Sequence, residues 1–231
     1  MIKENILRLK NDISLICQRL GRDSKDIAFV CVTKFATAPM IEEAINCGVT
    51  HIGENKVQEA LTKFGSLKPR TQKITRHMIG HLQTNKVKEA LKLFDLIQSL
   101  DSLKLVAAID RAAGNLGRSA DALLQVNISG EAQKHGVAPS EAMELLGEIS
   151  RFPNLCVLGL MTVAPLTQDE KTIRDCFRGL RELRDQAEKK FAGAKNIRMD
   201  FLSMGMSSDY RIAIEEGANM VRIGSAIFKN V

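Results

Sequence analysis

The chain has 231 residues, of which 45% are hydrophobic, so it can bury one large α/β core or two small ones. Its formal net charge is +6, but lysine and arginine are spread along the expected helix faces and only 4% of residues are aromatic, so we predict a solvated basic surface and no nucleic-acid partner. No apolar stretch approaches the roughly 20 residues of a membrane span and no signal-peptide pattern opens the chain, so we expect a cytoplasmic protein without membrane contact.

The first predicted element is an amphipathic helix that stops before Gly21, because glycine commonly follows a helix end. Its apolar residues recur at alternating spacings of four and three, which is the period of one helix face. They are Ile2, Ile6, Leu9, Ile13, Ile16 and Leu20. We expect this additional helix to cap the barrel that follows.

Short apolar runs separated by helical patterns occupy the rest of the chain. The predicted strands are residues 27–33, 50–53, 77–80, 96–100, 122–128, 155–160, 198–203 and 220–224. The run 27–32 is apolar throughout, as expected for a strand of a parallel sheet that is covered on both faces. The alternation predicts a single-domain (β/α)8 barrel over residues 1–231. A doubly wound open sheet is the alternative, although no G-x-G-x-x-G follows the first strand.

The segments between the strands carry helix signals of their own. Thr37 before Pro39 predicts one helix start, and Thr167-Gln-Asp-Glu170 matches a capping box at another. The segment after this box has one apolar stripe, formed by Ile173, Phe177, Leu180, Leu183, Ala187 and Phe191.

Lys34 differs from the other lysines because it directly follows the apolar first strand. In a barrel this position places its amine at the carboxyl end, where active sites form. Surroundings of low dielectric constant would favour the neutral amine, which condenses with an aldehyde to an imine. The alternative interpretation is a strand-end lysine that extends to water.

The alternation of side chains along a strand predicts which residues point inward. If Lys34 points into the barrel, Val32 and Val30 do so too, whereas Cys31 faces the helices. On the eighth strand, the same alternation directs Arg222 inward, toward a ligand.

Phosphate sites in such barrels use the loops after strands seven and eight. The first of these loops contains Ser207, and the second contains Gly224 and Ser225. Glycine permits close approach to a ligand, and serine hydroxyls donate hydrogen bonds. Loops of small residues also occur without a ligand, so this pattern alone leaves the site open.

Two histidines and one asparagine are weaker candidates. His77 and His81 are separated by a turn and no acidic residue has a metal-ligand spacing, so no metal site is predicted. One of them could contact a ring or a substrate. Asn55, at the barrel mouth, could donate to a cofactor oxygen or cap a helix. The five cysteines lack C-x-x-C spacing, which indicates reduced thiols, mostly in the core.

Several motifs distributed over nearly the whole chain carry a family resemblance. They are Val32-Thr-Lys34, Gly53-Glu-Asn55 with Gln58-Glu59, Ile79-Gly-His-Leu-Gln83 with Asn85-Lys86, Gln125-Val-Asn-Ile-Ser129, Gly159-Leu-Met161, Leu202-Ser-Met-Gly-Met-Ser207 and Val221-Arg-Ile-Gly224 with Ala226-Ile-Phe228. With them the chain resembles the pyridoxal 5′-phosphate (PLP) homeostasis proteins, which are related to the N-terminal barrel of alanine racemase. Any one of these motifs alone would be weak.

The resemblance implies roles for the residues already selected by position. Lys34 would be the Schiff-base lysine, Arg222 would lie beside the pyridine nitrogen, and Asn55 would lie near the ring. The phosphate would be surrounded by Ser207, Gly224 and Ser225. The chain departs from the family's pattern at Arg76, where tryptophan is frequent, which puts a contact at the pocket rim in doubt. Ser225 replaces a common threonine but keeps the hydroxyl.

The function implied is a carrier or buffer of PLP in vitamin B6 homeostasis, without enzymatic turnover. PLP-dependent apoenzymes are candidate recipients, and a monomer is expected because the racemase dimerisation domain is missing. The alternative is a PLP-dependent amino-acid racemase, but racemases use a second domain and a catalytic tyrosine, and Tyr210 is the only tyrosine of this chain. A barrel for another phosphorylated metabolite is a third interpretation, which gives Lys34 no necessary role.

Overall fold

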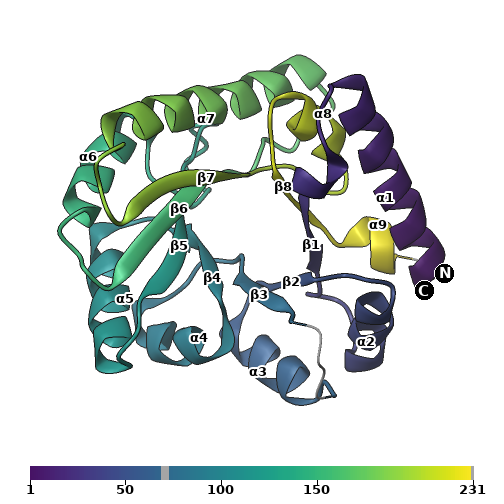
Figure 1. The fold of residues 1–231 in the computed structure, drawn as a ribbon, viewed down its shortest axis with the longest axis horizontal. Helices are drawn as coiled ribbons and strands as arrows, with labels where there is room; N and C mark the ends of the chain where they lie inside the picture. The colour runs from purple at the N-terminus through teal and green to yellow at the C-terminus, as the bar shows by residue number, and fades with distance from the viewer. Residues whose placement is uncertain (69–72, 230–231) are drawn as a thin grey trace.

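The structure is a computed structural model that describes residues 1–68 and 73–229. Eight parallel strands close into a barrel in sequence order, with helices around the outside (Figure 1). The strands are β1 (Ala28–Val32), β2 (His51–Glu54), β3 (Thr75–Met78), β4 (Leu96–Leu100), β5 (Ala120–Gln125), β6 (Leu155–Met161), β7 (Ile197–Ser203) and β8 (Met220–Ile223). The predicted (β/α)8 barrel is confirmed. That residues 1–231 form a single domain stays a prediction, and residues 69–72, 230 and 231 lie outside the described residues.

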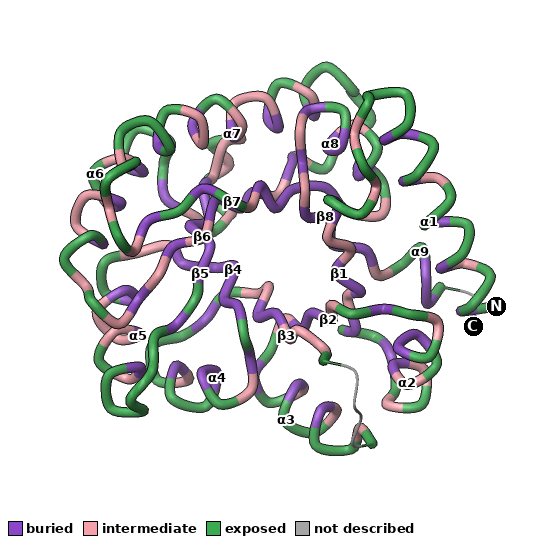
Figure 2. The backbone as a smooth tube through the Cα atoms, in the orientation of Figure 1, coloured by how far each residue is buried: buried purple, intermediate pink, exposed green. Residues whose placement is uncertain are grey.

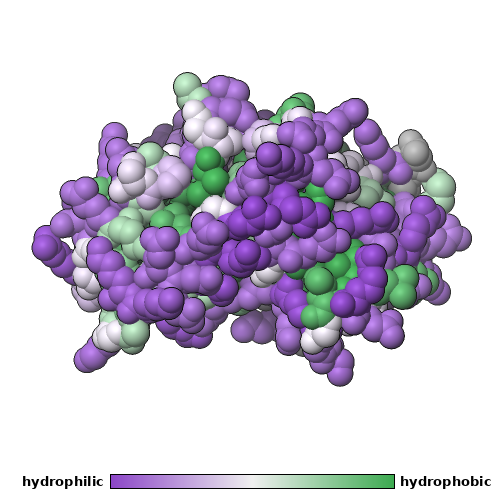
Figure 3. All heavy atoms as spheres, turned by 90° about the horizontal axis from the view of Figure 1, so that it is seen from above, coloured by the Kyte–Doolittle hydropathy of each residue, from purple (hydrophilic) through white to green (hydrophobic). Residues whose placement is uncertain are grey.

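The helices bury their inner faces against the barrel and expose their outer faces (Figure 2). They are α1 (Ile2–Arg19), α2 (Ala38–Asn46), α3 (Val57–Gly65), α4 (Val87–Leu93), α5 (Leu103–Asn115), α6 (Pro139–Ile149), α7 (Glu170–Lys190), α8 (Tyr210–Glu215) and α9 (Ser225–Phe228), with short 3₁₀ turns η1 (Ser24–Asp26) and η2 (Thr84–Lys86). The face that carries α7 is largely hydrophilic, with small separate apolar patches (Figure 3). In the described part of the chain, no helix combines the length and apolarity needed to cross a membrane.

Helix α1 was expected to cap an end of the barrel. Instead, it joins the outer ring of helices. It packs against α2, α8 and α9, on the side of β1 and β8 (Figure 1). Helix α9 has only four residues, and the apolar stripe of α1 is buried where α1 packs beside it. The Asn5 side-chain amide donates to the Ile227 carbonyl at 2.9 Å and ties α1 to α9. Leu20 was wrongly included in the stripe, because it is 41% exposed and Cys17 is buried instead.

The barrel interior and the layer between barrel and helices are separate apolar clusters. Val30 packs inside the barrel with Leu96, Leu123, Met161 and Met220. Cys31 belongs to the larger cluster that includes the helices. The inward and outward directions predicted for β1 are therefore confirmed. All five cysteines are free and three of them are buried, as expected.

Several predicted boundaries differ from those of the structure. Strand β3 begins at Thr75, before its apolar part, because the strand pairs through its backbone with β2, Thr75 opposite His51. Strand β5 ends at Gln125, because Val126 bridges to Val137 in the following loop. The start of α2 after Thr37 is confirmed.

The capping box at the start of α7 is wrong. The N-cap residue is Asp169, whose carboxylate accepts hydrogen bonds from the backbone amides of Lys171 and Thr172. The Thr167 hydroxyl instead accepts from the Asp169 amide at 3.1 Å. The carboxylate of Asp169 reaches two unpaired helix amides, which explains why the helix begins after it.

Candidate functional site

A cavity of about 530 Å³ opens at the carboxyl ends of β1, β7 and β8. The predicted site residues that line it are Lys34, Ser207, Arg222, Gly224 and Ser225. The carboxyl ends of parallel strands meet at the same end of a barrel, which explains why residues far apart in sequence converge here. Asn55 lies outside this cavity and lines a neighbouring hollow with Met78 and His81.

Lys34 reaches the cavity from the turn that follows β1. Its side chain is exposed, and its Nζ lies 4.8 Å from the centre of the Phe35 ring, which is itself 84% exposed. The expected surroundings of low dielectric constant are therefore not found around this amine. The reason is that β1 ends at Val32, so that Lys34 stands two residues beyond the buried strand.

The backbone of Lys34 is held in place by a buried ion pair. The Lys63 amine, from α3, donates to the carbonyls of Thr33 and Lys34 at 2.8 and 2.9 Å. It also lies 2.8 Å from the carboxylate of Glu54, which is fully buried. The Thr33 hydroxyl donates to the same carboxylate at 2.6 Å. Sequence reasoning missed Lys63, because it lies in a helix and only the fold brings it to the end of β1.

Arg222 points into the barrel as predicted and is 4% exposed. Its Nη1 donates to the Ser203 hydroxyl at 2.7 Å and its Nη2 donates to the Thr162 carbonyl at 2.8 Å. Among the described residues, no acceptor is bonded to its Nε–H. Burial lowers the pKa of Arg222 to about 10, opposed by the negative charge of Asp209, so the guanidinium is cationic at neutral pH.

A chain of buried hydrogen bonds continues from Arg222 through the barrel. The Ser203 hydroxyl donates to Gln98 Oε1 at 2.7 Å. Gln98 Nε2 lies 3.0 Å from His77 Nδ1, and His77 Nε2 lies 2.9 Å from His51 Nδ1. Ser203, Gln98 and His77 are fully buried. The chain therefore connects the cavity to the amino end of the barrel, where His51 lines a separate hollow.

Arg222 can only donate, so Ser203 accepts from it. The Ser203 hydroxyl donates to Gln98 Oε1, and the amide nitrogen of Gln98 faces the Nδ1 of His77. That nitrogen must accept, so neutral His77 carries its proton on Nε2 and donates to His51. Burial, and then the charge of His51, lower the pKa of His77 to about 3, which agrees with a neutral ring.

The serine loop after β7 is fixed by Asp209, which is 5% exposed. Its carboxylate accepts a hydrogen bond from the Met206 amide at 2.5 Å. The Ser207 hydroxyl accepts from the Ala226 amide at 3.3 Å, which connects this loop to the loop after β8. Gly224 itself lies close to the end of β1, because a Cβ there would lie 3.0 Å from the Val32 carbonyl oxygen.

Tyr210 and Arg76, which the sequence comparison singled out, both lie outside the cavity. The hydroxyl of Tyr210 is bonded to Asp12 of α1. Tyr210 does not line the cavity. The guanidinium of Arg76 lies 5.4 Å from the centre of the Phe64 ring, in the helix layer. The departure at Arg76 from the family's tryptophan therefore does not touch the cavity.

Known proteins are similar to this chain over nearly its whole length. Residues 5–230 match the family model described as alanine racemase, N-terminal domain. The chain is 40% identical over 225 residues to the pyridoxal phosphate homeostasis protein of Aquifex aeolicus, with 97% of this chain and 96% of the relative covered. It is 36% identical over 230 residues to the protein of the same name from Vibrio alginolyticus, with 98% and 96% covered.

Solved structures are also similar to this chain. The structure of PipY from Synechococcus elongatus PCC7942 with PLP bound superposes with a TM-score of 0.85 at 32% identity, over 99% of this chain and all of that one. The alanine racemase of Clostridium difficile 630 gives a TM-score of 0.77 at 14% identity, and the match covers 100% of this chain but 56% of the racemase. This second likeness shows a shared fold.

Proposed function

The chain belongs to the pyridoxal phosphate homeostasis protein family, and on that premise we propose that it binds PLP in the cavity between β1, β7 and β8. The observation that carries this proposal is that one cavity holds a lysine amine, a buried guanidinium and two serine hydroxyls, those of Lys34, Arg222, Ser207 and Ser225. These groups match the aldehyde, the ring nitrogen and the phosphate of PLP. A relative of the same family, PipY, was solved with PLP bound.

Each residue has a role in the proposed site. Lys34 would supply the amine that holds PLP through a Schiff base. The Nε–H of Arg222 would donate to the ring nitrogen. Asn55 lines the neighbouring hollow, and its proposed contact with the ring rests on the family resemblance alone. The phosphate is held by hydroxyls and by close backbone approach at Ser207, Gly224 and Ser225.

We propose that the protein carries or buffers PLP and is not a racemase. When bound, PLP supplies an electron-withdrawing ring, which is most effective when its nitrogen is protonated. A cationic arginine beside that nitrogen donates to the unprotonated form and disfavours the protonated one. In addition, the hydroxyl of Tyr210 is bonded to Asp12 and Tyr210 does not line the cavity, so this tyrosine is not placed to act as the second base of a racemase. That the protein acts as a cytoplasmic monomer and delivers PLP to apoenzymes stays a prediction.

The proposal is tested by titrating PLP into the purified protein and recording the visible absorbance after dialysis. We expect the wild type to retain PLP and Lys34→Ala to lose the visible band. Lys229→Ala is the matched control, because Lys229 lines the same cavity. A wild-type protein without a band would instead favour another phosphorylated metabolite. Steady racemisation of alanine by the wild type, lost in Lys34→Ala, would favour the enzyme.

A further inference from the structure

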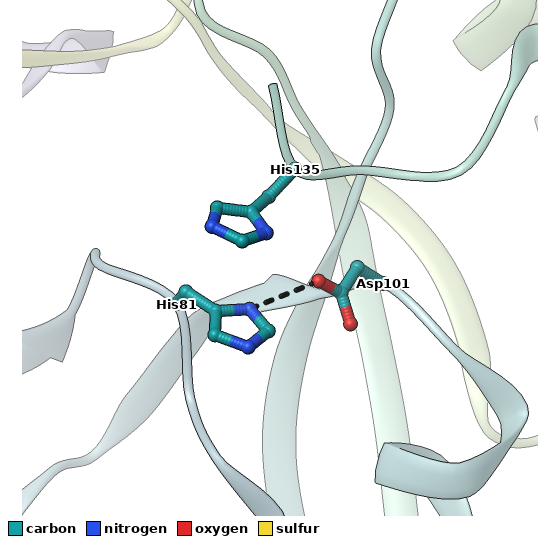
Figure 4. A group of neighbouring side chains, drawn as sticks. All are labelled: His81, Asp101 and His135. Carbon is teal, nitrogen blue, oxygen red and sulfur yellow. Dashed lines mark hydrogen bonds and ion pairs between the residues drawn. The ribbon is translucent and has the colours of Figure 1, made fainter. Parts of the chain in front are cut away.

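A second group of polar side chains converges at the carboxyl end of the barrel, outside the cavity. His81, Asp101 and His135 follow β3, β4 and β5, three neighbouring strands, so closure of the barrel brings their loops together (Figure 4). One ligand atom from each residue lies within 4.8 Å of those of the other two. The rings of His81 and His135 are stacked, with centres 4.1 Å apart and an angle of 10° between their planes.

We propose that His81, Asp101 and His135 form a binding site for a divalent transition-metal ion, with zinc as the ion that the donors favour. Two imidazoles and one carboxylate are typical ligands of zinc, and catalytic or exchangeable zinc sites use three protein ligands with a water in the fourth position. The His81 and His135 side chains are exposed, so an ion can reach them from solvent.

The backbone of each proposed ligand is fixed by contacts that do not depend on an ion. Gly80, before His81, packs so closely on Asn55 that a Cβ would lie 2.3 Å from its carbonyl oxygen. Asp101 directly precedes Ser102, the N-cap of α5, and is 13% exposed. The carbonyl of His135 accepts a hydrogen bond from the Gln125 side chain at 3.0 Å. The three loops are therefore preorganised, and an ion would have to order only the side chains.

The charges around the triad leave Asp101 available for a cation. Its carboxylate lies 3.2 Å from Nδ1 of His81. Lys134, which neighbours His135 in sequence, is engaged elsewhere: its amine lies 3.1 Å from a Glu131 carboxylate oxygen and donates to the Ala164 carbonyl at 2.9 Å. The lysine nearest in sequence is thus bonded to other partners, and the two imidazoles lie beside Asp101 (Figure 4).

Only a small side-chain movement separates this arrangement from a zinc site. With metal–ligand bonds of about 2.0–2.1 Å, the donors of a tetrahedral site lie about 3.4 Å apart. The present separations of up to 4.8 Å close to that value when the exposed imidazoles rotate out of their stack. Sequence reasoning paired His81 with His77 and found no acidic partner, whereas the fold separates these two and supplies Asp101 and His135.

The test is calorimetric titration of ZnCl₂ into untagged wild-type protein and into His81→Ala, His135→Ala and Asp101→Asn. We expect one site in the wild type and at least a tenfold loss of affinity in each variant. Asp175→Asn is the matched control, since Asp175 is an exposed carboxylate outside the triad. All variants keep the five cysteines, so zinc bound by thiols stays constant across the series.

A crystal soaked in ZnCl₂ gives a second readout that does not depend on how the variants fold. Anomalous scattering at the zinc edge is expected to show a peak between the three side chains. Equal affinity in wild type and all three variants, or a soaked crystal with no peak at this position, would overturn the proposal. Both results are independent of whether PLP binds in the other cavity.

Discussion

The guanidinium of Arg222 donates to the hydroxyl of Ser203 at 2.7 Å, and both side chains are buried between the proposed PLP cavity and the barrel interior. This bond fixes the position of the group that we propose for the ring nitrogen. Ser203→Ala removes it and leaves Gln98 Oε1 without its donor. We expect the free energy of unfolding to fall by about 1–3 kcal/mol and PLP to bind more weakly. Urea denaturation and PLP titration measure the two effects.

Ser208→Ala is the control for Ser203, because Ser208 is exposed and lines the same cavity. It should change the free energy of unfolding by less than about 0.5 kcal/mol. If Ser203→Ala behaves like this control in both measurements, the chain of hydrogen bonds does not position Arg222.

The hydroxyls of Ser207 and Ser225 are predicted to contact the phosphate. Alanine at either position should weaken PLP binding by about 1.5–3 kcal/mol, the range for hydrogen bonds to charged groups. Pyridoxal lacks the phosphate and should bind each variant as it binds the wild type. Competition titrations with both ligands measure the difference, and equal weakening of PLP and pyridoxal would place the phosphate elsewhere.

Lys63 is predicted to position Lys34 through the backbone. Lys63→Met removes the donor to two carbonyls and leaves the carboxylate of Glu54 buried without its cation, so we expect a loss of about 3–5 kcal/mol in the free energy of unfolding. PLP occupancy at Lys34 should fall as well. Lys56→Met is the control, because the Lys56 pair with Glu59 is exposed at the surface. Unchanged stability in Lys63→Met would contradict the anchoring role.

His77 should make the protein sensitive to acid. Burial lowers its pKa from 6.5 to about 3 in the folded state. Between these two values the unfolded chain binds the proton and the folded chain does not, so stability present above pH 6.5 is lost as the pH falls toward 3. One such group can lower the free energy of unfolding by at most about 1.4 kcal/mol for each pH unit.

His77→Gln removes the titrating ring but keeps a donor for His51 and an acceptor for Gln98. Denaturation curves at several pH values between 7 and 4 should therefore show a smaller loss of stability in this variant. The same slope in wild type and His77→Gln would show that other groups cause the acid sensitivity.

The sequence was informative where position along a strand determines the geometry. Lys34, Arg222 and Ser207 each stand at or after the end of a predicted strand, and parallel strands bring their ends together. The inward direction of Arg222 followed from the alternation of side chains. Both predictions need only the order of the strands and the alternation of side chains along each strand.

The parts that were missed depend on packing between elements. Lys63 comes from a helix, and the exposure of Lys34 depends on where β1 ends. Asn55 lies in a neighbouring hollow because the loop before His81 packs on it. The sequence did contain a signal for the buried hydrogen bonds between Arg222 and His51. Gln98 interrupts an apolar strand, and a polar residue at such a position indicates a hydrogen-bond partner inside the barrel.

The central claim, that Lys34 holds PLP, is tested most directly by borohydride reduction of the PLP-loaded protein followed by mass mapping of its peptides. Reduction fixes the cofactor on the lysine that carries it. We predict a pyridoxyl group on Lys34 and none on Lys229, which lines the same cavity. A pyridoxyl group found mainly on Lys229 or on any other lysine of the wild-type protein would contradict the account.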